Sequence, residues 1–462
     1  MAGMNVENAS YAVSRDLVDE FRKADPAMSP DTAVERILEE TFGSIYANLS
    51  IKPLDDYLMR TSDKEKMKES VKEMTRITKV MAYPLKQVDL FTVSSYNGKE
   101  LLGWRHTPRG ARPAVIRNDT LIKAGADAGV MKELLKSTIS KDEDRQLMLV
   151  ILGRNLSDER ADEISPDEIF FMGVSAYVTL AQRCGLSKTP AVKSAHLVDR
   201  FARNMLFRSY ISHQEETCKI LYRTFEADGK KLNKVFAVFS SRYGRIEQDA
   251  VINGTIVPIE KEMGVSIINS FCMSHEDTAL VLEFPEKAQE FSRTYKLQDE
   301  VVPLLIVRTS DAGNCSVVIR GGFRLSGKRW ISFMPGAVVK RQHTNAASTD
   351  RILTDVSDRI FCEYTKIPER LVELLSMDPV DDPAALTEKI MEHSGLKKIL
   401  TDSAYREDLE AMKNSYGPSV YGPYDICMRF LDLLEKYQEQ KNYTRCDHIR
   451  EKVMEIVFRY RF

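Results

Sequence analysis

A change in the spacing of apolar residues divides this chain into helical ends and a strand-rich middle. From about Ser62 to Met81 the apolar side chains recur every three to four residues, which predicts an amphipathic helix. From Val88 the pattern switches to alternation, and Asn97-Gly98 predicts a hairpin turn into a second strand. We therefore expect the α+β class: a mixed α/β core with antiparallel strands, flanked by N-terminal helices and a helical C-terminal lobe.

The same patterns predict three parts of the chain. Residues 1–84 are expected to form a helical N-terminal segment, residues 85–345 the mixed α/β core, and residues 346–462 the helical C-terminal lobe. In the core, a proline-containing capping box at residues 165–168 predicts the start of a helix that continues to Cys184. Further helices are predicted over about 191–225 and 249–263, and strands over 235–240, 278–284, 301–309, 315–320 and 330–334.

Cysteine usage and hydropathy indicate a cytoplasmic protein, in the host cytoplasm if the chain is encoded by a phage. The seven cysteines are scattered and contain no C-x-x-C pair, which argues against a disulfide framework or a structural zinc site. No stretch approaches the roughly 18 apolar residues of a membrane span, so no membrane partner is expected. The N-terminal residues also lack the apolar region of a secretory signal.

Motifs for several kinds of enzyme chemistry are missing from the sequence. It contains no G-x-S-x-G, H-E-x-x-H or P-C-x-x-C motif, which are typical of serine hydrolases, zinc proteases and zinc deaminases. Gly322 to Lys328 matches G-x-x-x-x-G-K, but Arg329 stands where a phosphate-binding loop needs a serine or threonine for magnesium. We therefore predict no catalytic residue, no metal site and no cofactor.

Charge is distributed unevenly along the chain, although the net charge is only -2. Residues 1–60 hold 6 basic and 11 acidic side chains, and residues 351–462 hold 17 and 21, so the middle of the chain is basic. Three basic stretches interleave with aromatic residues: 98–117, 200–245 and 318–341. Cations that neutralise phosphates, next to rings on which bases stack, are typical of proteins that bind single-stranded nucleic acid.

These stretches predict a nucleic-acid-binding site, most simply for single-stranded DNA, in a protein that forms homo-oligomers. Six cations are expected to contact phosphates, and three aromatic side chains are candidates for stacking on bases. The cations are Arg242, Arg245, Arg320, Arg324, Lys328 and Arg329, and the aromatic residues are Tyr243, Phe323 and Trp330.

Several short patterns in the same order resemble a phage- and plasmid-borne family known as domain of unknown function 932. They are residues 219–224, 236–247, 299–303, 306–314 and 322–325, and residues 416–428 resemble the helical end of that family. The resemblance supplies no catalytic residue. It implies a setting in mobile elements and cytoplasmic DNA metabolism, and it favours an accessory role in phage recombination, annealing or replication.

Two other functions are compatible with the sequence. The charged helical ends are also what a structural or assembly protein of a phage would use for subunit contacts. A metal-dependent enzyme acting on phosphodiesters would need carboxylates brought together from distant positions. The candidates for that site are Asp249, Asp299, Glu300, Asp311 and His275.

Overall fold

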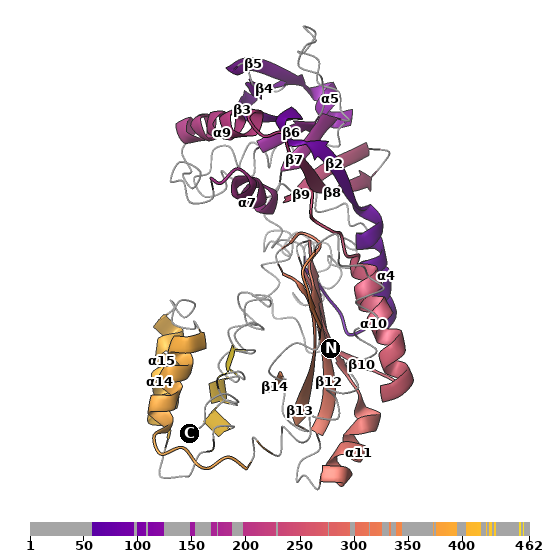
Figure 1. Ribbon diagram of the computed structural model, residues 1–462, viewed down its shortest axis with the longest axis vertical. Helices are drawn as coiled ribbons and strands as arrows, with labels where there is room; N and C mark the ends of the chain where they lie inside the picture. Colours follow the sequence, from indigo (N-terminus) through magenta and orange to yellow (C-terminus); the bar gives the residue numbers. More distant parts are fainter. Residues whose placement is uncertain are drawn as a thin grey trace, which may run out of the picture.

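The described part of the chain forms two β-sheets that lie one above the other along the long axis of the molecule (Figure 1). The computed structural model describes residues 58–96, 99–107, 110–123, 148–152, 168–172, 174–186, 197–227, 230–275, 277–295, 301–313, 315–325, 332–333, 339–343, 376–394, 403–416 and a few further positions between 373 and 456. Helices pack against both sheets, so the predicted α+β class is confirmed. The helices expected before residue 58 lie outside the described residues.

The lower sheet, sheet A, is antiparallel throughout. Its strands follow the order β1-β10-β11-β12-β13-β14, and β15 also pairs with β13. Their bounds are β1 (Leu58–Arg60), β10 (Ile267–Ser274), β11 (Thr278–Glu283), β12 (Val301–Thr309), β13 (Val317–Leu325), β14 (Ser332–Phe333) and β15 (Val339–Arg341). The central strand β12 has the sequence VVPLLIVRT and is buried on both faces, as its run of apolar residues requires. Helix α11 (Pro285–Tyr295) packs against it.

The upper sheet, sheet B, has the strand order β2-β8-β9-β7-β6-β3-β4-β5, which makes β2 and β5 its edge strands. All neighbours are antiparallel except the parallel pair β7 and β9. The bounds are β2 (Thr78–Pro84), β3 (Val88–Tyr96), β4 (Glu100–Thr107), β5 (Gly110–Arg117), β6 (Met148–Leu152), β7 (Ile169–Met172), β8 (Thr217–Ala227) and β9 (Lys230–Ser240).

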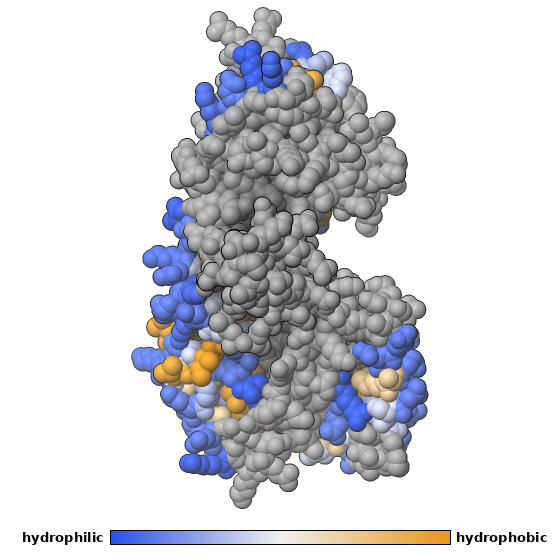
Figure 2. All heavy atoms as spheres, turned by 180° about the vertical axis from the view of Figure 1, so that it is seen from behind, coloured by the Kyte–Doolittle hydropathy of each residue, from blue (hydrophilic) through white to orange (hydrophobic). Residues whose placement is uncertain are grey.

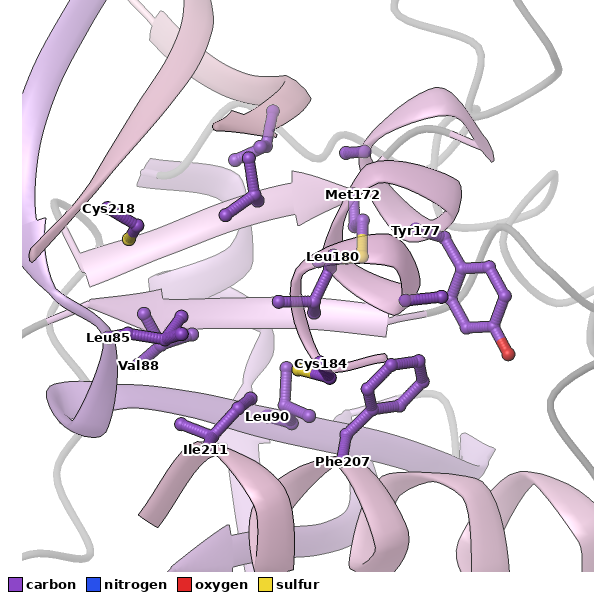
Figure 3. Close-up of a cluster of buried hydrophobic side chains, with 14 of the residues drawn as sticks. Leu85, Val88, Leu90, Met172, Tyr177, Leu180, Cys184, Phe207, Ile211 and Cys218 are labelled. Atoms are coloured by element: carbon purple, nitrogen blue, oxygen red, sulfur yellow. The ribbon is translucent and has the colours of Figure 1, made fainter. Parts of the chain in front are cut away.

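A hydrophobic core lies between sheet B and two helices, α7 (Val174–Arg183) and α9 (Leu197–Ser212) (Figure 3). Phe207 and Ile211 of α9 point toward Leu90 of the sheet, and the ring of Tyr177 on α7 meets the Phe207 ring edge to face at 5.4 Å. Fully burying an aliphatic or aromatic side chain contributes about 1.5–3 kcal/mol. This core fixes α9 against β3 and β4 at the outer end of the sheet.

Two helices join the sheets and pack against each other. Helix α4 (Lys64–Ile77) leaves β1 of sheet A and enters β2 of sheet B, while α10 (Gln248–Met263) leads from β9 of sheet B to β10 of sheet A. The helices therefore run in opposite directions, as Figure 1 shows. Lys64 forms an ion pair with Glu260, and the backbone N–H of Asp249 donates to the Thr75 hydroxyl at 3.1 Å. The chain thus crosses between the sheets along one helical pair.

The start of α4 depends on a single side chain. The Asp63 carboxylate accepts hydrogen bonds from the backbone N–H groups of Glu65 and Lys66 at 2.9 and 3.1 Å. Replacing Asp63 with alanine leaves both donors without this acceptor, so we expect a loss of about 1 kcal/mol in the free energy of unfolding. Urea denaturation followed by circular dichroism measures the change. Asp63→Asn is the control, because its side-chain oxygen still caps the helix; an equal loss in both variants would contradict a capping role.

Several predicted elements match the structure, and three are corrected by it. The pairing of β3 with β4, the helix after Gln248 and the hairpin of β12 and β13 are confirmed. Helix α4 ends at Ile77 instead of Met81, because residues 78–84 pair with β8. Residues 169–172, predicted as helix, form β7. The helix predicted over 191–225 ends at Ser212 in the structure, and β8 follows. In each case, pairing in a sheet outweighs the local helical spacing.

Two helices are described in the predicted C-terminal lobe, α14 (Pro383–Ser394) and α15 (Ser403–Asn414). They contact each other, and the Lys413 ammonium on α15 donates to the Glu388 carboxylate on α14 at 2.6 Å. The Thr387 and Tyr416 hydroxyls lie 3.0 Å apart and tie the end of α15 to α14. This pair agrees with the helical character expected for residues 346–462.

Candidate nucleic-acid interface

The nine residues predicted to bind nucleic acid do not form one surface in the described structure. Arg320, Phe323 and Arg324 belong to β13 of sheet A. Arg242, Tyr243 and Arg245 lie in the segment that joins β9 to α10, beside sheet B. The remaining three, Lys328, Arg329 and Trp330, lie outside the described residues and stay predictions.

Two of the three β13 residues, Arg320 and Phe323, are buried. Phe323 is fully buried, so its ring has no face on which a base could stack, and the Arg320 side chain is buried as well. Arg324 is partly exposed, but its guanidinium donates to both oxygens of the Glu283 carboxylate on β11 at 2.8 and 2.7 Å. The Glu283 carboxylate therefore already neutralises the Arg324 charge that was predicted to bind a phosphate. The expectation that Phe323 and Arg320 are surface contacts is therefore corrected by their burial.

Tyr243 and Arg245 have structural partners. The Tyr243 ring is buried and lies parallel to Phe239 at 3.8 Å, and its hydroxyl donates to the Asp311 carbonyl at 2.6 Å. Burial raises the pKa of this hydroxyl well above its ordinary value. The Arg245 guanidinium donates to the Thr75 carbonyl at the end of α4, at 2.9 Å. Tyr243 therefore offers no free ring face, whereas Arg242 is exposed and stays available for an anion.

A network centred on Arg223 of β8 joins the two sheets, and no sequence motif predicts it. The buried Arg223 guanidinium donates to the Asp311 carboxylate at 2.8 Å, to the His275 carbonyl at 2.5 Å and to the Thr78 hydroxyl at 2.9 Å. Asp311 lies between β12 and β13, and His275 between β10 and β11. Two hairpin ends of sheet A thus meet one arginine of sheet B. We call this region the junction.

Neighbouring groups complete the junction. The Gln248 amide of α10 donates to the Asp311 carboxylate at 3.1 Å, and the Thr278 hydroxyl donates to the Gln248 carbonyl oxygen at 2.8 Å. Gly313 has a φ of +82°, and a Cβ at this position would lie 2.5 Å from the Phe239 ring. Only glycine therefore lets this turn of sheet A approach sheet B so closely. The junction is a structural contact, built from residues of both sheets.

Two other arginines of the predicted basic stretches are buried, Arg105 in sheet B and Arg208 on helix α9, which packs against that sheet. The Arg105 guanidinium of β4 donates to the Asp89 carboxylate of β3 from Nε at 2.9 Å, and Arg208 of α9 lies 3.8 Å from the same carboxylate. Arg208 also donates to the Lys86 carbonyl at 2.8 Å. Burial and the Arg208 charge lower the pKa of the adjacent His106 to about 4, so its ring is neutral at neutral pH. These cations neutralise an internal carboxylate and cannot contact phosphates.

The outer end of sheet B does present cations and an aromatic ring to solvent. Trp104 of β4 is 36% exposed and Val115 of β5 is 40% exposed. In the register of this pair Trp104 is opposite Pro113 and Leu102 is opposite Val115, so Trp104, Pro113 and Val115 lie on one face of the sheet. Trp104 lies in one of the three basic stretches but is not among the nine residues predicted from the sequence to bind nucleic acid.

Exposed cations surround this apolar face. Arg117 of β5 lies on it opposite Glu100, and Arg112 projects from the other face of the same edge strand. Lys123, at the end of the short helix α5 (Asn118–Lys123), is exposed as well. Arg112, Arg117 and Lys123 form no ion pair with any residue that the structure describes. In Figure 2, hydrophilic side chains gather beside a small apolar patch at the end of the molecule where Figure 1 places β5 and α5. We call Trp104, Arg112, Pro113, Val115, Arg117 and Lys123 the outer surface.

The carboxylates proposed for a metal-dependent enzyme are not assembled into a metal site in the described structure. Asp311 and His275 both lie at the junction, where Arg223 bonds the Asp311 carboxylate and the His275 carbonyl. Asp249 accepts a hydrogen bond from the Asn253 amide on α10. Among the described residues, no group of three histidine, cysteine or acidic side chains is placed to hold a metal ion. Asp299 and Glu300 lie outside the described residues.

Comparison with known proteins returned no relative. No family model, curated protein or solved structure matches this chain. The resemblance to domain of unknown function 932 therefore stays a prediction. Within the described ranges, no helix is both long and apolar enough to cross a membrane.

Proposed function

We propose that this chain is a phage-type accessory protein that binds single-stranded DNA on the outer surface of sheet B. The observation that carries the proposal is the exposed Trp104 ring with Arg117 on the same face of the sheet, together with two further exposed cations, Arg112 on the other face of edge strand β5 and Lys123 at the end of α5. An exposed aromatic ring stacks on a base of any sequence, and this contact is worth about 1–3 kcal/mol per base. The surrounding guanidinium and ammonium groups neutralise phosphates and release the counterions bound to them.

Single strands suit this surface better than a duplex does. A ring that lies on the face of a sheet can stack only on a base that is already unstacked from its neighbours, and a duplex keeps its bases inside. Pro113 in the middle of β5 supports the same interpretation, because it interrupts the backbone N–H groups along this edge and disfavours strand addition by a protein partner. The outer surface is thereby left to a ligand that binds through side chains.

The first test measures affinity and its salt dependence. We expect labelled single-stranded oligonucleotides to bind with a negative salt slope, and each of Arg112→Ala and Arg117→Ala to reduce that slope by about 0.7. Trp104→Ala should weaken binding by about 5- to 150-fold, the range that corresponds to the loss of one stacked base. Fluorescence anisotropy across a series of salt concentrations measures both quantities.

The matched control is Arg293→Ala, which removes an exposed arginine from α11 on sheet A and should leave the slope unchanged. The protein contains only two tryptophans, so a Trp330→Phe background makes Trp104 the sole tryptophan, and quenching of its fluorescence by DNA reports stacking directly. Equal slopes for Arg112→Ala and Arg293→Ala would contradict the proposal. Absence of binding at low salt, together with a large assembly in light scattering, would favour the structural or assembly protein.

A further inference from the structure

The junction contains two histidine rings from two segments of sheet A: His275, which is buried, and His343, which is half-buried. His275 lies between β10 and β11, and its ring stacks on Phe236 of β9 at 5.4 Å. His343 follows β15, and its ring stacks on Tyr243 at 5.7 Å with an interplanar angle of 11°. Because both rings pack on side chains that belong to or directly follow sheet B, separating the sheets would bring them into water.

The surroundings of His275 disfavour a charged imidazole. The Arg223 guanidinium lies 4.2 Å from the centroid of the Phe236 ring, and the Lys234 ammonium lies 5.7 Å from it. Complete burial, followed by these two cations, lowers the pKa of His275 well below its ordinary value of 6.5. Protonation in the closed junction would place a third positive charge in an enclosed space.

His343 is disfavoured as a cation for a different reason. Neither of its ring nitrogens has a hydrogen-bond partner among the described residues. If the ring were protonated, neither of its N–H groups would have a described acceptor. Burial lowers the pKa of this ring, and the Asp311 carboxylate opposes that shift only in part. The backbone holds the residue in place, since the N–H of Gly244 donates to the His343 carbonyl at 3.3 Å.

The other charges at the junction do not compensate for added protons. From sheet B, the Lys219 ammonium donates to the Tyr243 carbonyl at 2.5 Å, and Arg245 reaches the end of α4. The only buried carboxylate described at the junction is Asp311, which already bonds Arg223. The charged side chains that act on the His275 ring are Arg223 and Lys234, and the one that acts on the His343 ring is Asp311. The titratable side chain stacked on His343 is Tyr243.

We propose that the junction is an acid-sensitive latch: it is closed while His275 and His343 are neutral and opens when they take up protons, with both sheets remaining folded. Groups whose pKa is lowered in the closed form stabilise that form above the pKa they have in water, and this stabilisation is lost as the pH falls below about 6.5. Each histidine then favours opening by up to about tenfold per pH unit, and the two together by up to about a hundredfold.

Hydrogen exchange of the full chain, followed by mass spectrometry between pH 8 and pH 5 and corrected for intrinsic rates, tests the latch without any ligand. We expect protection at residues 241–247 and 310–313 to fall steeply below about pH 6.5, while β12 keeps its protection. Loss of protection in β12 together with these segments would mean global unfolding and would overturn the proposal, as would constant protection across the series.

Substitution of each histidine shows which side chain takes up the protons that open the junction. His343→Phe keeps a ring on Tyr243 but cannot titrate, so the pH dependence should decrease from about a hundredfold to about tenfold per pH unit. His275→Gln should have a similar effect. If His275→Gln does not fold, His343→Phe still tests the proposal, because His343 is only half-buried and tolerates substitution better. His213→Gln, at an exposed histidine just after α9, is the control and should match the wild type. An unchanged pH dependence in His343→Phe would overturn the assignment.

Discussion

Replacing Asp311 with asparagine is expected to lower the free energy of unfolding by about 3–5 kcal/mol, because the buried Arg223 charge then loses the carboxylate that is its ion-pair partner among the described residues. Arg223 and Asp311 are 0% and 1% exposed, so water cannot replace the lost partner. Chemical denaturation with guanidinium chloride, followed by fluorescence and by circular dichroism, measures the loss. Because Arg223 joins the sheets, we also expect the two probes to separate into two transitions.

A double-mutant cycle shows whether the loss comes from this pair. Arg223→Met combined with Asp311→Leu removes both charges, and this double variant should be considerably more stable than the sum of its single variants implies. Arg76→Ala breaks the exposed ion pair with Glu73 on α4 and serves as the control, with an expected change of about 0.5 kcal/mol or less. An equally small change for Asp311→Asn would contradict the role of Arg223 as the link between the sheets.

The second large effect is expected at Asp89, the carboxylate inside sheet B. Asp89→Ala removes the carboxylate to which Arg105 donates and which lies 3.8 Å from Arg208, so both buried cations lose the counter-charge that the structure describes for them. Breaking a buried pair in this way costs about 3–5 kcal/mol, and a second stranded guanidinium places the expected loss at the upper end of that range. Thermal and urea denaturation measure it.

Glu215→Ala provides the comparison for Asp89→Ala. It removes an exposed partner of Lys86, whose ammonium lies 2.7 Å from the Glu215 carboxylate, so we expect less than about 1 kcal/mol. If Asp89→Ala lowers stability as little as Glu215→Ala does, the assignment of Arg105 and Arg208 as internal partners of Asp89 is wrong.

Local patterns predicted those elements whose partners are close in sequence. Asn97-Gly98 and the turn after Thr309 each join neighbouring strands, so turn chemistry alone was enough to identify both hairpins. The helical spacing of α4 continued into residues 78–81, whose strand partner is β8, about 140 residues further along the chain. A pattern of neighbouring residues cannot predict that these residues pair with β8 and form a strand.

The candidate site could be predicted only in part, because the sequence shows charge but not burial. Arg105, Arg208 and Arg223 contributed to the basic stretches, yet each is buried against an internal carboxylate. The hydrogen bonds of Arg223 join residues 52, 88 and 145 positions apart, which no motif records. Phe323 and Trp104 lie in similar basic surroundings in the sequence, but one ring is fully buried and the other is exposed.

The chain passes from sheet A to sheet B through α4 and returns through α10, and this connectivity sets the order in which the two sheets can form during synthesis. β1 leaves the ribosome before any strand of sheet B, but its partner β10 follows more than 200 residues later. At about 5–20 residues per second, that interval lasts on the order of 10–40 s. Most of sheet B can therefore form before β10, the partner of β1, has been synthesised. Because α4 follows β1 and packs against α10, which precedes β10, this helical pair then brings the two strands close to each other.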